Sequence, residues 1–278
     1  MRVVVTGAGG QLGTDLTRAM AGWEVIPLNR DQLADREQIL QVVTTTEPDA
    51  IVHAGAWTAV DDCESDPEKA FRSNALASRH VAEAARLVGA HVLYVSTDYV
   101  FDGTATTPYN EWDAPNPQSV YGRSKLAGER EVLAQLPSAA VVRTGWVCGA
   151  HGNNMVKTIL RLASEHERLT FVDDQHGCPT FTADLAHMIR RLVVSRLPGL
   201  FHVTNQGPTT WFEFARAVLA ASGQDPERVS PVSTADFARP APRPAFSVLD
   251  NAALRLQGIP LLDDWRIPME RTVKELSA

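Results

Sequence analysis

The chain has 278 residues, of which 44% are hydrophobic and 21% are charged, and its formal net charge is −7. This length predicts one large α/β unit with at most a small second lobe, and the composition argues against disorder and fibrous repeats. The negative charge offers no broad basic surface to a phosphate backbone, so we expect no nucleic-acid partner.

The first residues enter a strand and a glycine turn, which leaves no room for a signal peptide, and no apolar run reaches the ~18 residues that cross a bilayer. We therefore expect a cytoplasmic protein with no membrane partner. Cys63, Cys148 and Cys178 are odd in number and far apart, so we expect three reduced, structural thiols.

Short apolar runs alternate with longer segments of helical period over the first half of the chain, a pattern typical of βαβ units. Strands are predicted at residues 2–6, 23–29, 50–54, 91–97 and 139–145. Helices are predicted at residues 11–21, 35–46, 67–88 and 117–136. Right-handed crossovers then give an α/β fold with a Rossmann-type, doubly wound parallel sheet.

The pattern is less regular beyond residue 145. Helices are predicted at residues 154–164, 182–194 and 210–221, strands at 170–172 and 200–203, and an extended stretch at 239–244. We expect residues 1–146 to form a dinucleotide-binding core, to which residues 170–205 return. Residues 147–169 and 206–278 are expected to form a small C-terminal substrate-binding lobe.

Gly7, Gly10 and Gly13 form a G-x-x-G-x-x-G pattern directly after the first predicted strand, where the first helix begins. Glycines in that place allow a tight turn and close approach of the backbone to a pyrophosphate, which the helix N-terminus attracts. A glycine turn also occurs as plain punctuation between a strand and a helix. Its position at the first strand favours a dinucleotide site.

The second strand ends at Asn29 and Arg30, where an acidic residue would normally bind the ribose of NAD. Asn29 can hydrogen-bond a hydroxyl group, and Arg30 is either a partner for a 2′-phosphate or a solvated turn residue. The predicted cofactor is NADPH or NADH, with NADPH slightly favoured.

Tyr121 and Lys125 are four residues apart in a predicted helix, so their side chains share one face. Thr97 ends a predicted strand, at the edge of the sheet where ligands bind. Hydride addition to a carbonyl leaves an alkoxide that must be protonated, and a neighbouring cation lowers the pKa of a tyrosine near 10 by ~1 to 3 pH units. A Tyr-x-x-x-Lys pair alone is a weak signal. Because the pair follows the glycine turn and Thr97 in the chain, in that order, we predict that Thr97, Tyr121 and Lys125 form a catalytic set.

Several segments together carry a specific resemblance: TGAGGQLG (residues 6–13), HAGAWTAVDDCE (53–64), STDYVFDG (96–103), VYGRSKLAGE (120–129), RTGWV (143–147), DDQHGCPT (173–180) and RPAFSVLD (243–250). Over nearly its whole length the chain resembles the dTDP-4-dehydrorhamnose reductase family of extended short-chain dehydrogenases. The resemblance implies NAD(P)H-dependent reduction of the 4-keto group of dTDP-4-dehydro-6-deoxy-L-mannose to dTDP-L-rhamnose.

The resemblance also implies roles for single residues. Tyr121 would donate the proton, Lys125 would hold the nicotinamide ribose, and Thr97 and Asp98 would meet the sugar beside Trp146. The remaining residues implied at the cofactor are Gly10, Gln11, Leu12, Gln32, Leu33, Ala56, Trp57 and Thr58. Arg243 would pair with the diphosphate.

Some of these assignments have plainer alternatives. Asp98 is either a substrate contact or the cap of a turn, Trp146 a stacking platform or a core aromatic, and Arg243 a diphosphate partner or a surface residue. Asp98 is followed by Tyr99 rather than the glutamate of sister dehydratases, which favours simple reduction. His53 and Asn74 are expected to be structural.

The chain departs from its family at Asn29 and Gln32, where related reductases often carry aspartates, and this puts NADH preference in doubt. Some members of that family dimerise through a magnesium ion. Only Asp15 and Asp184 are candidate ligands in this chain, so no metal is predicted. We expect a monomer or a homodimer. Two rival functions stay open: 4-ketoreduction of another nucleotide-linked deoxysugar, and a non-catalytic regulatory subunit of the same fold.

Overall fold

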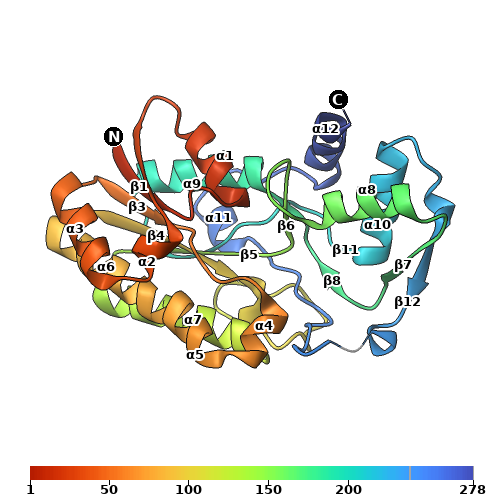
Figure 1. Cartoon of the computed structure of the whole chain (residues 1–278), viewed down its shortest axis with the longest axis horizontal. Coiled ribbons are helices and arrows are strands. Elements are labelled where there is room, and N and C mark those ends of the chain that lie inside the picture. Colours follow the sequence, from red (N-terminus) through yellow and green to blue (C-terminus); the bar gives the residue numbers. More distant parts are fainter. Residues whose placement is uncertain (238, 278) are drawn as a thin grey trace.

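A parallel six-stranded sheet organises the larger part of the computed structural model, which describes residues 1–237 and 239–277 (Figure 1). The strands are β1 (Arg2–Thr6), β2 (Glu24–Leu28), β3 (Ala50–His53), β4 (His91–Thr97), β5 (Ala140–Thr144) and β10 (Gly199–His202). They lie in the order β2-β1-β3-β4-β5-β10, and every pairing is parallel. The doubly wound fold predicted from the sequence is confirmed, with strand ends within one residue of the predicted ones.

Helices cover both faces of this sheet. One layer holds α1 (Gln11–Ala19), α9 (Thr182–Ser195) and α11 (Ala252–Leu256), and the other holds α3 (Arg36–Thr46), α6 (Ala77–Val88) and α7 (Val120–Gln135). Val3 and Val5 pack into the first layer and Val4 into the second, so successive residues of β1 are all buried. Burial on both faces explains why these strands are unbroken apolar runs.

The segment predicted as one helix over residues 67–88 is interrupted. It consists of α5 (Pro67–Phe71), a π-helical turn (Arg72–Leu76) and α6. The buried Asn74 lies in the π turn, where its carbonyl oxygen accepts hydrogen bonds from Ser78 and Tyr94. Single π turns of this kind are frequent at functional sites. Four of the described helices were not predicted: α2 (Arg30–Leu33), α4 (Val60–Ser65), α11 and α12 (Arg266–Leu276).

A second apolar cluster lies beside the sheet, on the right in Figure 1. It joins α8 (Met155–Glu165), α10 (Trp211–Ala221) and α12 (Arg266–Leu276) to the parallel pair β7 (Leu169–Val172) and β12 (Val229–Val232). Short strands connect the two parts: β6 (Val147–Cys148), β8 (His176–Gly177), β9 (Thr180–Phe181) and β11 (Thr209–Thr210). The remaining elements are 3₁₀ turns at Asp98–Val100, Pro226–Arg228 and Thr234–Asp236.

The chain adds β2 on one side of β1 and then crosses to add β3 on the other side. The strand order therefore reverses between β1 and β3. In open α/β sheets, ligands bind at the carboxyl ends of the strands at this switch point. Among the described helices, none is both long and apolar enough to cross a bilayer. All three cysteines are buried and free, as expected.

Candidate active site

The glycine turn joins β1 to α1 with little space to spare. Gly7 has a left-handed φ of 68°, and a Cβ there would lie 2.9 Å from Gly55 Cα. A Cβ on Gly13 would lie 2.1 Å from the Gly7 carbonyl oxygen. Gly10 occupies the N-cap position of α1, where no side chain accepts a hydrogen bond from the first turn, and that turn holds no acidic residue. The uncapped helix N-terminus on a close glycine turn fits the diphosphate of a dinucleotide.

At the end of β2, Asn29 and Gln32 cap the short helix α2 reciprocally. The Asn29 N–H donates to Gln32 Oε1 and the Gln32 N–H to Asn29 Oδ1, both at 3.0 Å. Leu33 is buried, and a Cβ on Gly55 would meet its Cδ2 at 2.7 Å. The Arg30 side chain lies outside the described part of the structure, so its part in cofactor choice stays a prediction.

The loop after β3, which holds Ala56, Trp57 and Thr58, is fixed by Asn74. The Trp57 N–H donates to Asn74 Oδ1 at 2.8 Å, and Asn74 Nδ2 donates to the Trp57 carbonyl at 3.1 Å and to Ser124 Oγ at 2.9 Å. Asn74 therefore ties the loop to α7. Its inward position was predicted; its link to the loop, 17 residues away in sequence, was not.

Thr97 and Tyr121 come together where β4 ends and α7 begins. The Thr97 hydroxyl donates to Asp98 Oδ1 at 3.0 Å, and the Tyr121 ring packs edge-on against Tyr99 with 5.6 Å between centroids. A Cβ on Gly122 would lie 2.2 Å from the Tyr99 carbonyl oxygen. The glycine thus lets the first turn of α7 lie directly on the turn that follows Thr97.

Burial controls the charge of the Tyr121–Lys125 pair in this ligand-free chain. It raises the pKa of Tyr121 well above its ordinary value, while the Thr97 hydroxyl acts in the opposite direction. It also lowers the pKa of Lys125 to about 7. The expected depression of the Tyr121 pKa by Lys125 is wrong for the ligand-free chain, because burial is the largest influence on this hydroxyl group and raises its pKa. Lys125 Nζ donates to the Val95 carbonyl at 2.7 Å.

Asp98 is a buried carboxyl group with one open oxygen. It is 2% exposed, and burial raises its pKa to about 6. Within the described residues no group meets Asp98 Oδ2 with hydrogen-bond geometry, although the Ser247 hydroxyl is near enough to lower the pKa. A Cβ on Gly145 would lie 2.6 Å from that oxygen. Asp98 can therefore exchange a hydrogen bond with a bound hydroxyl group.

Trp146 and Arg243 each have a partner that the sequence did not indicate. Trp146 is half-buried, adopts a left-handed φ of 49°, and stacks on Trp211 with 3.5 Å between ring centroids. One of its faces is therefore covered by protein. Arg243 Nη2 lies 3.0 Å from Asp61 Oδ1, and its guanidinium lies 6.0 Å from the centroid of the Tyr99 ring. It is thus neither a plain surface residue nor free of charge partners.

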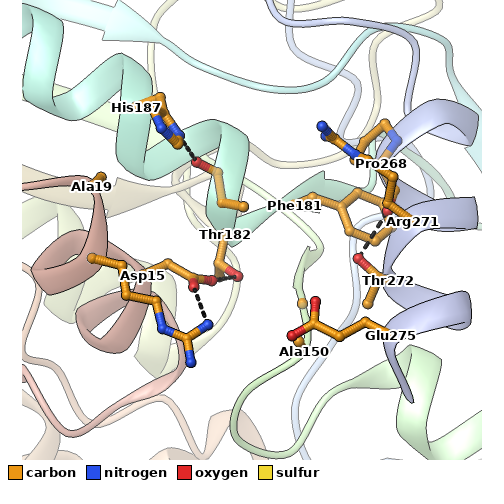
Figure 2. Close-up of a pocket in the computed structure, with 13 residues that line it drawn as sticks. Asp15, Ala19, Ala150, Phe181, Thr182, His187, Pro268, Arg271, Thr272 and Glu275 are labelled. Atoms are coloured by element: carbon orange, nitrogen blue, oxygen red, sulfur yellow. Dashed lines mark hydrogen bonds and ion pairs between the residues drawn. The ribbon is translucent and has the colours of Figure 1, made fainter. Parts of the chain in front are cut away.

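Asp15 borders a pocket of about 350 Å³ between α1, α9 and α12 (Figure 2), and Tyr121 is not among the residues that line it. Its Oδ2 accepts from Thr182 Oγ1 at 2.5 Å. Asp184 is 2.8 Å from Arg271 and accepts from Asn205 at 2.9 Å. Across residues 1–237 and 239–277, no three His, Cys, Asp or Glu side chains gather as a metal site.

Comparison with known proteins gives one consistent picture. The family model of the RmlD substrate binding domain matches residues 1–278. A dTDP-4-dehydrorhamnose reductase of Mycobacterium tuberculosis is 43% identical, covering 95% of this chain and 90% of that one. A probable dTDP-4,6-dihydroxy-2-methyloxan-3-one 4-ketoreductase of Streptomyces antibioticus is 40% identical, covering 100% and 96%. The NADP complex of dTDP-4-dehydrorhamnose reductase from Bacillus anthracis is 40% identical, with a TM-score of 0.96 and 99% of each chain covered.

Proposed function

The chain belongs to the family of the RmlD substrate binding domain, and from this premise we propose that it is an NAD(P)H-dependent ketoreductase. It reduces the 4-keto group of dTDP-4-dehydrorhamnose to give dTDP-L-rhamnose. The observation that carries the proposal is the meeting of Thr97, Tyr121 and Lys125 at the carboxyl edge of the sheet, next to a tight glycine turn.

The cofactor would be held by residues of this chain around the switch point. The turn at Gly7, Gly10 and Gly13, with Gln11 and Leu12, would take the diphosphate. The adenosine end would lie against Asn29, Arg30, Gln32 and Leu33, and the rest against Ala56, Trp57 and Thr58. The NADP complex of the Bacillus anthracis relative supports a slight preference for NADPH. When bound, the cofactor supplies a hydride.

Tyr121 completes the reduction by giving its hydroxyl proton to the carbonyl oxygen. Its hydroxyl group carries its proton at neutral pH, as a proton donor must, and burial in the ligand-free chain raises its pKa further. Thr97 hydrogen-bonds the same oxygen, and Lys125 holds the nicotinamide ribose as a cation close to the developing negative charge. Asp98 binds a sugar hydroxyl beside Trp146, and Arg243 faces the diphosphate. The tyrosine then regains a proton from solvent.

The proposal extends to the setting of the reaction. Residues 1–146 and 170–205 bind the cofactor, and residues 147–169 and 206–278 form the substrate lobe. The protein acts in the cytoplasm as a monomer or homodimer, without nucleic acid or membrane. Three buried, free cysteines are in keeping with a reducing compartment.

A second candidate is 4-ketoreduction of a different deoxysugar, favoured by the similarity to the probable 4-ketoreductase of Streptomyces antibioticus. The two are separated by comparing kcat/KM for dTDP-4-dehydrorhamnose with that for other dTDP-4-keto sugars, with NADPH saturating. We expect dTDP-4-dehydrorhamnose to give the highest value, and a higher value for another sugar would assign the chain to that one. The regulatory-subunit alternative predicts no turnover with any of them.

A further inference from the structure

Three consecutive residues of β4 contact α7 at the proposed site. The Val95 carbonyl accepts from Lys125 Nζ at 2.7 Å, and Ser96 Oγ donates to Glu129 Oε1 at 2.5 Å. The next residue, Thr97, belongs to the proposed catalytic set. Glu129 follows Lys125 by four residues on α7, so both side chains rise from the same face of the helix.

Glu129 is part of a buried ion pair. It is 4% exposed, and Arg143 on β5 is 3% exposed. The guanidinium binds it in a fork, with Nε at 2.9 Å from Oε1 and Nη2 at 2.7 Å from Oε2. Arg143 lies in register with Ser96, so both partners of Glu129 come from neighbouring strands. A buried ion pair stabilises a core little better than apolar residues do, so packing alone is a poor reason for this one.

Glu129, one turn further along α7, is the acidic group that acts on the charge of Lys125. The ionisable groups around Lys125 and Glu129 come from four elements: His53 of β3, Tyr94 of β4, Tyr121 one turn before Lys125 on α7, and Arg143 of β5, which is bound to Glu129. Burial raises the pKa of both tyrosines and lowers the pKa of His53 to about 3, so these three are neutral at pH 7. Burial lowers the pKa of Lys125, and Glu129 acts against that.

We propose that Glu129, seated by Ser96 and Arg143, is a positioning residue that keeps Lys125 protonated beside the cofactor. This inference rests on the proposed function for the contact of Lys125 with the nicotinamide ribose. A protonated Lys125 favours an anionic cofactor, and the neutral amine does not. Cofactor affinity should therefore weaken as the pH rises through the Lys125 pKa, and Glu129 should set where that occurs.

The test is the dissociation constant of NADP⁺, measured by titration calorimetry between about pH 5 and pH 9. Replacing Glu129 by Gln keeps the shape and removes the charge. In the Glu129→Gln variant, we expect the loss of NADP⁺ affinity with rising pH to begin about one pH unit lower than in the parent. The reason is that a nearby opposite charge raises the pKa of a lysine by about that amount. Affinity near pH 5, where Lys125 is protonated in both proteins, should change little.

Two matched variants separate charge from stability. Glu129→Asp retains the carboxylate, and Val132→Ala opens a cavity one turn further along α7 without changing charge; both should lower Tm and leave the pH midpoint unchanged. Should Glu129→Gln not fold, Glu129→Gln with Arg143→Met removes both buried charges and should still move the midpoint down. An unchanged midpoint in the charge-removing variant would reduce the pair to a structural tie between helix and sheet.

The same experiment keeps the two proposals apart. A midpoint that Glu129→Gln shifts down, in a protein whose parent turns over no keto-sugar, would overturn the proposed function and support the assignment of Glu129. Normal turnover by the parent, together with a pH midpoint that Glu129→Gln does not shift, would support the proposed function and overturn the assignment of Glu129.

Discussion

Tyr121 is the residue on which the proposed chemistry depends most. Tyr121→Phe removes one hydroxyl group and almost no volume from a buried ring. We expect kcat to fall by about 10²- to 10⁴-fold, the usual contribution of a positioned proton donor, while the dissociation constant of NADPH stays the same. Steady-state kinetics and a fluorescence titration of NADPH measure the two effects. Turnover within a few-fold of the parent would remove Tyr121 from the mechanism.

Because the buried Asp98 has a raised pKa, we expect the free energy of unfolding to depend on pH. A carboxyl whose pKa rises on folding contributes stability below its ordinary pKa of 3.8, and this is lost as the pH rises through about 6. The difference corresponds to about 3 kcal/mol at neutral pH. Asp98→Asn should therefore raise the Tm of the ligand-free chain, and raise it more at pH 8 than at pH 5, while weakening substrate binding. A gain of equal size at both pH values would show that the carboxyl is not the cause.

For single residues, the sequence predicts those contacts whose partners are close in the chain or lie in one motif. Tyr121 and Lys125 lie on one helix, and Thr97 comes to them because parallel strands end at one edge. Asp61 beside Arg243 and Trp211 beside Trp146 were missed, because each pair joins segments that are far apart in sequence. Only the packed chain reveals which charge or ring a side chain meets.

The turn between β1 and α1 is an element whose geometry depends on the absence of side chains. A methyl group on Gly13 would meet the Gly7 carbonyl, whereas one on Gly9 would meet nothing within 4 Å, and Gly9 does not have a positive φ. Gly13→Ala should therefore cost about 1–3 kcal/mol and lower the Tm of the ligand-free chain, with Gly9→Ala close to the parent. Equal Tm values for both variants would contradict the close packing of α1 on the turn.

The strands of the main sheet were predictable because burial on both faces makes each of them a continuous apolar run. The π turn at Arg72–Leu76 was not, because it accommodates hydrogen bonds that Asn74 makes to distant residues. Two-residue strands such as β8 and β11 were missed for a related reason. They form by pairing between segments that are distant in sequence, and they have no period of their own.

For the whole molecule, the ion pair of Arg243 with Asp61 joins the C-terminal segment to α4 beside Tyr99. Arg243→Ala should raise KM for the dTDP-sugar by about 10-fold or more, the effect of one lost charged hydrogen bond, without changing NADPH affinity. Arg239 is the matched control, because it meets the same Asp61 at 3.4 Å with a side chain that is 62% exposed. An equal effect of Arg239→Ala would show that the segment acts through its charge alone.

Turnover of the proposed substrate tests the whole account most directly. Purified protein would be mixed with NADPH and, separately, with NADH, dTDP-4-dehydrorhamnose would be added, and the loss of nicotinamide absorbance would be followed while the sugar product is identified. We predict oxidation of the cofactor matched mole for mole by dTDP-L-rhamnose, faster with NADPH. No oxidation by a folded protein that binds the cofactor would contradict the assignment of this substrate.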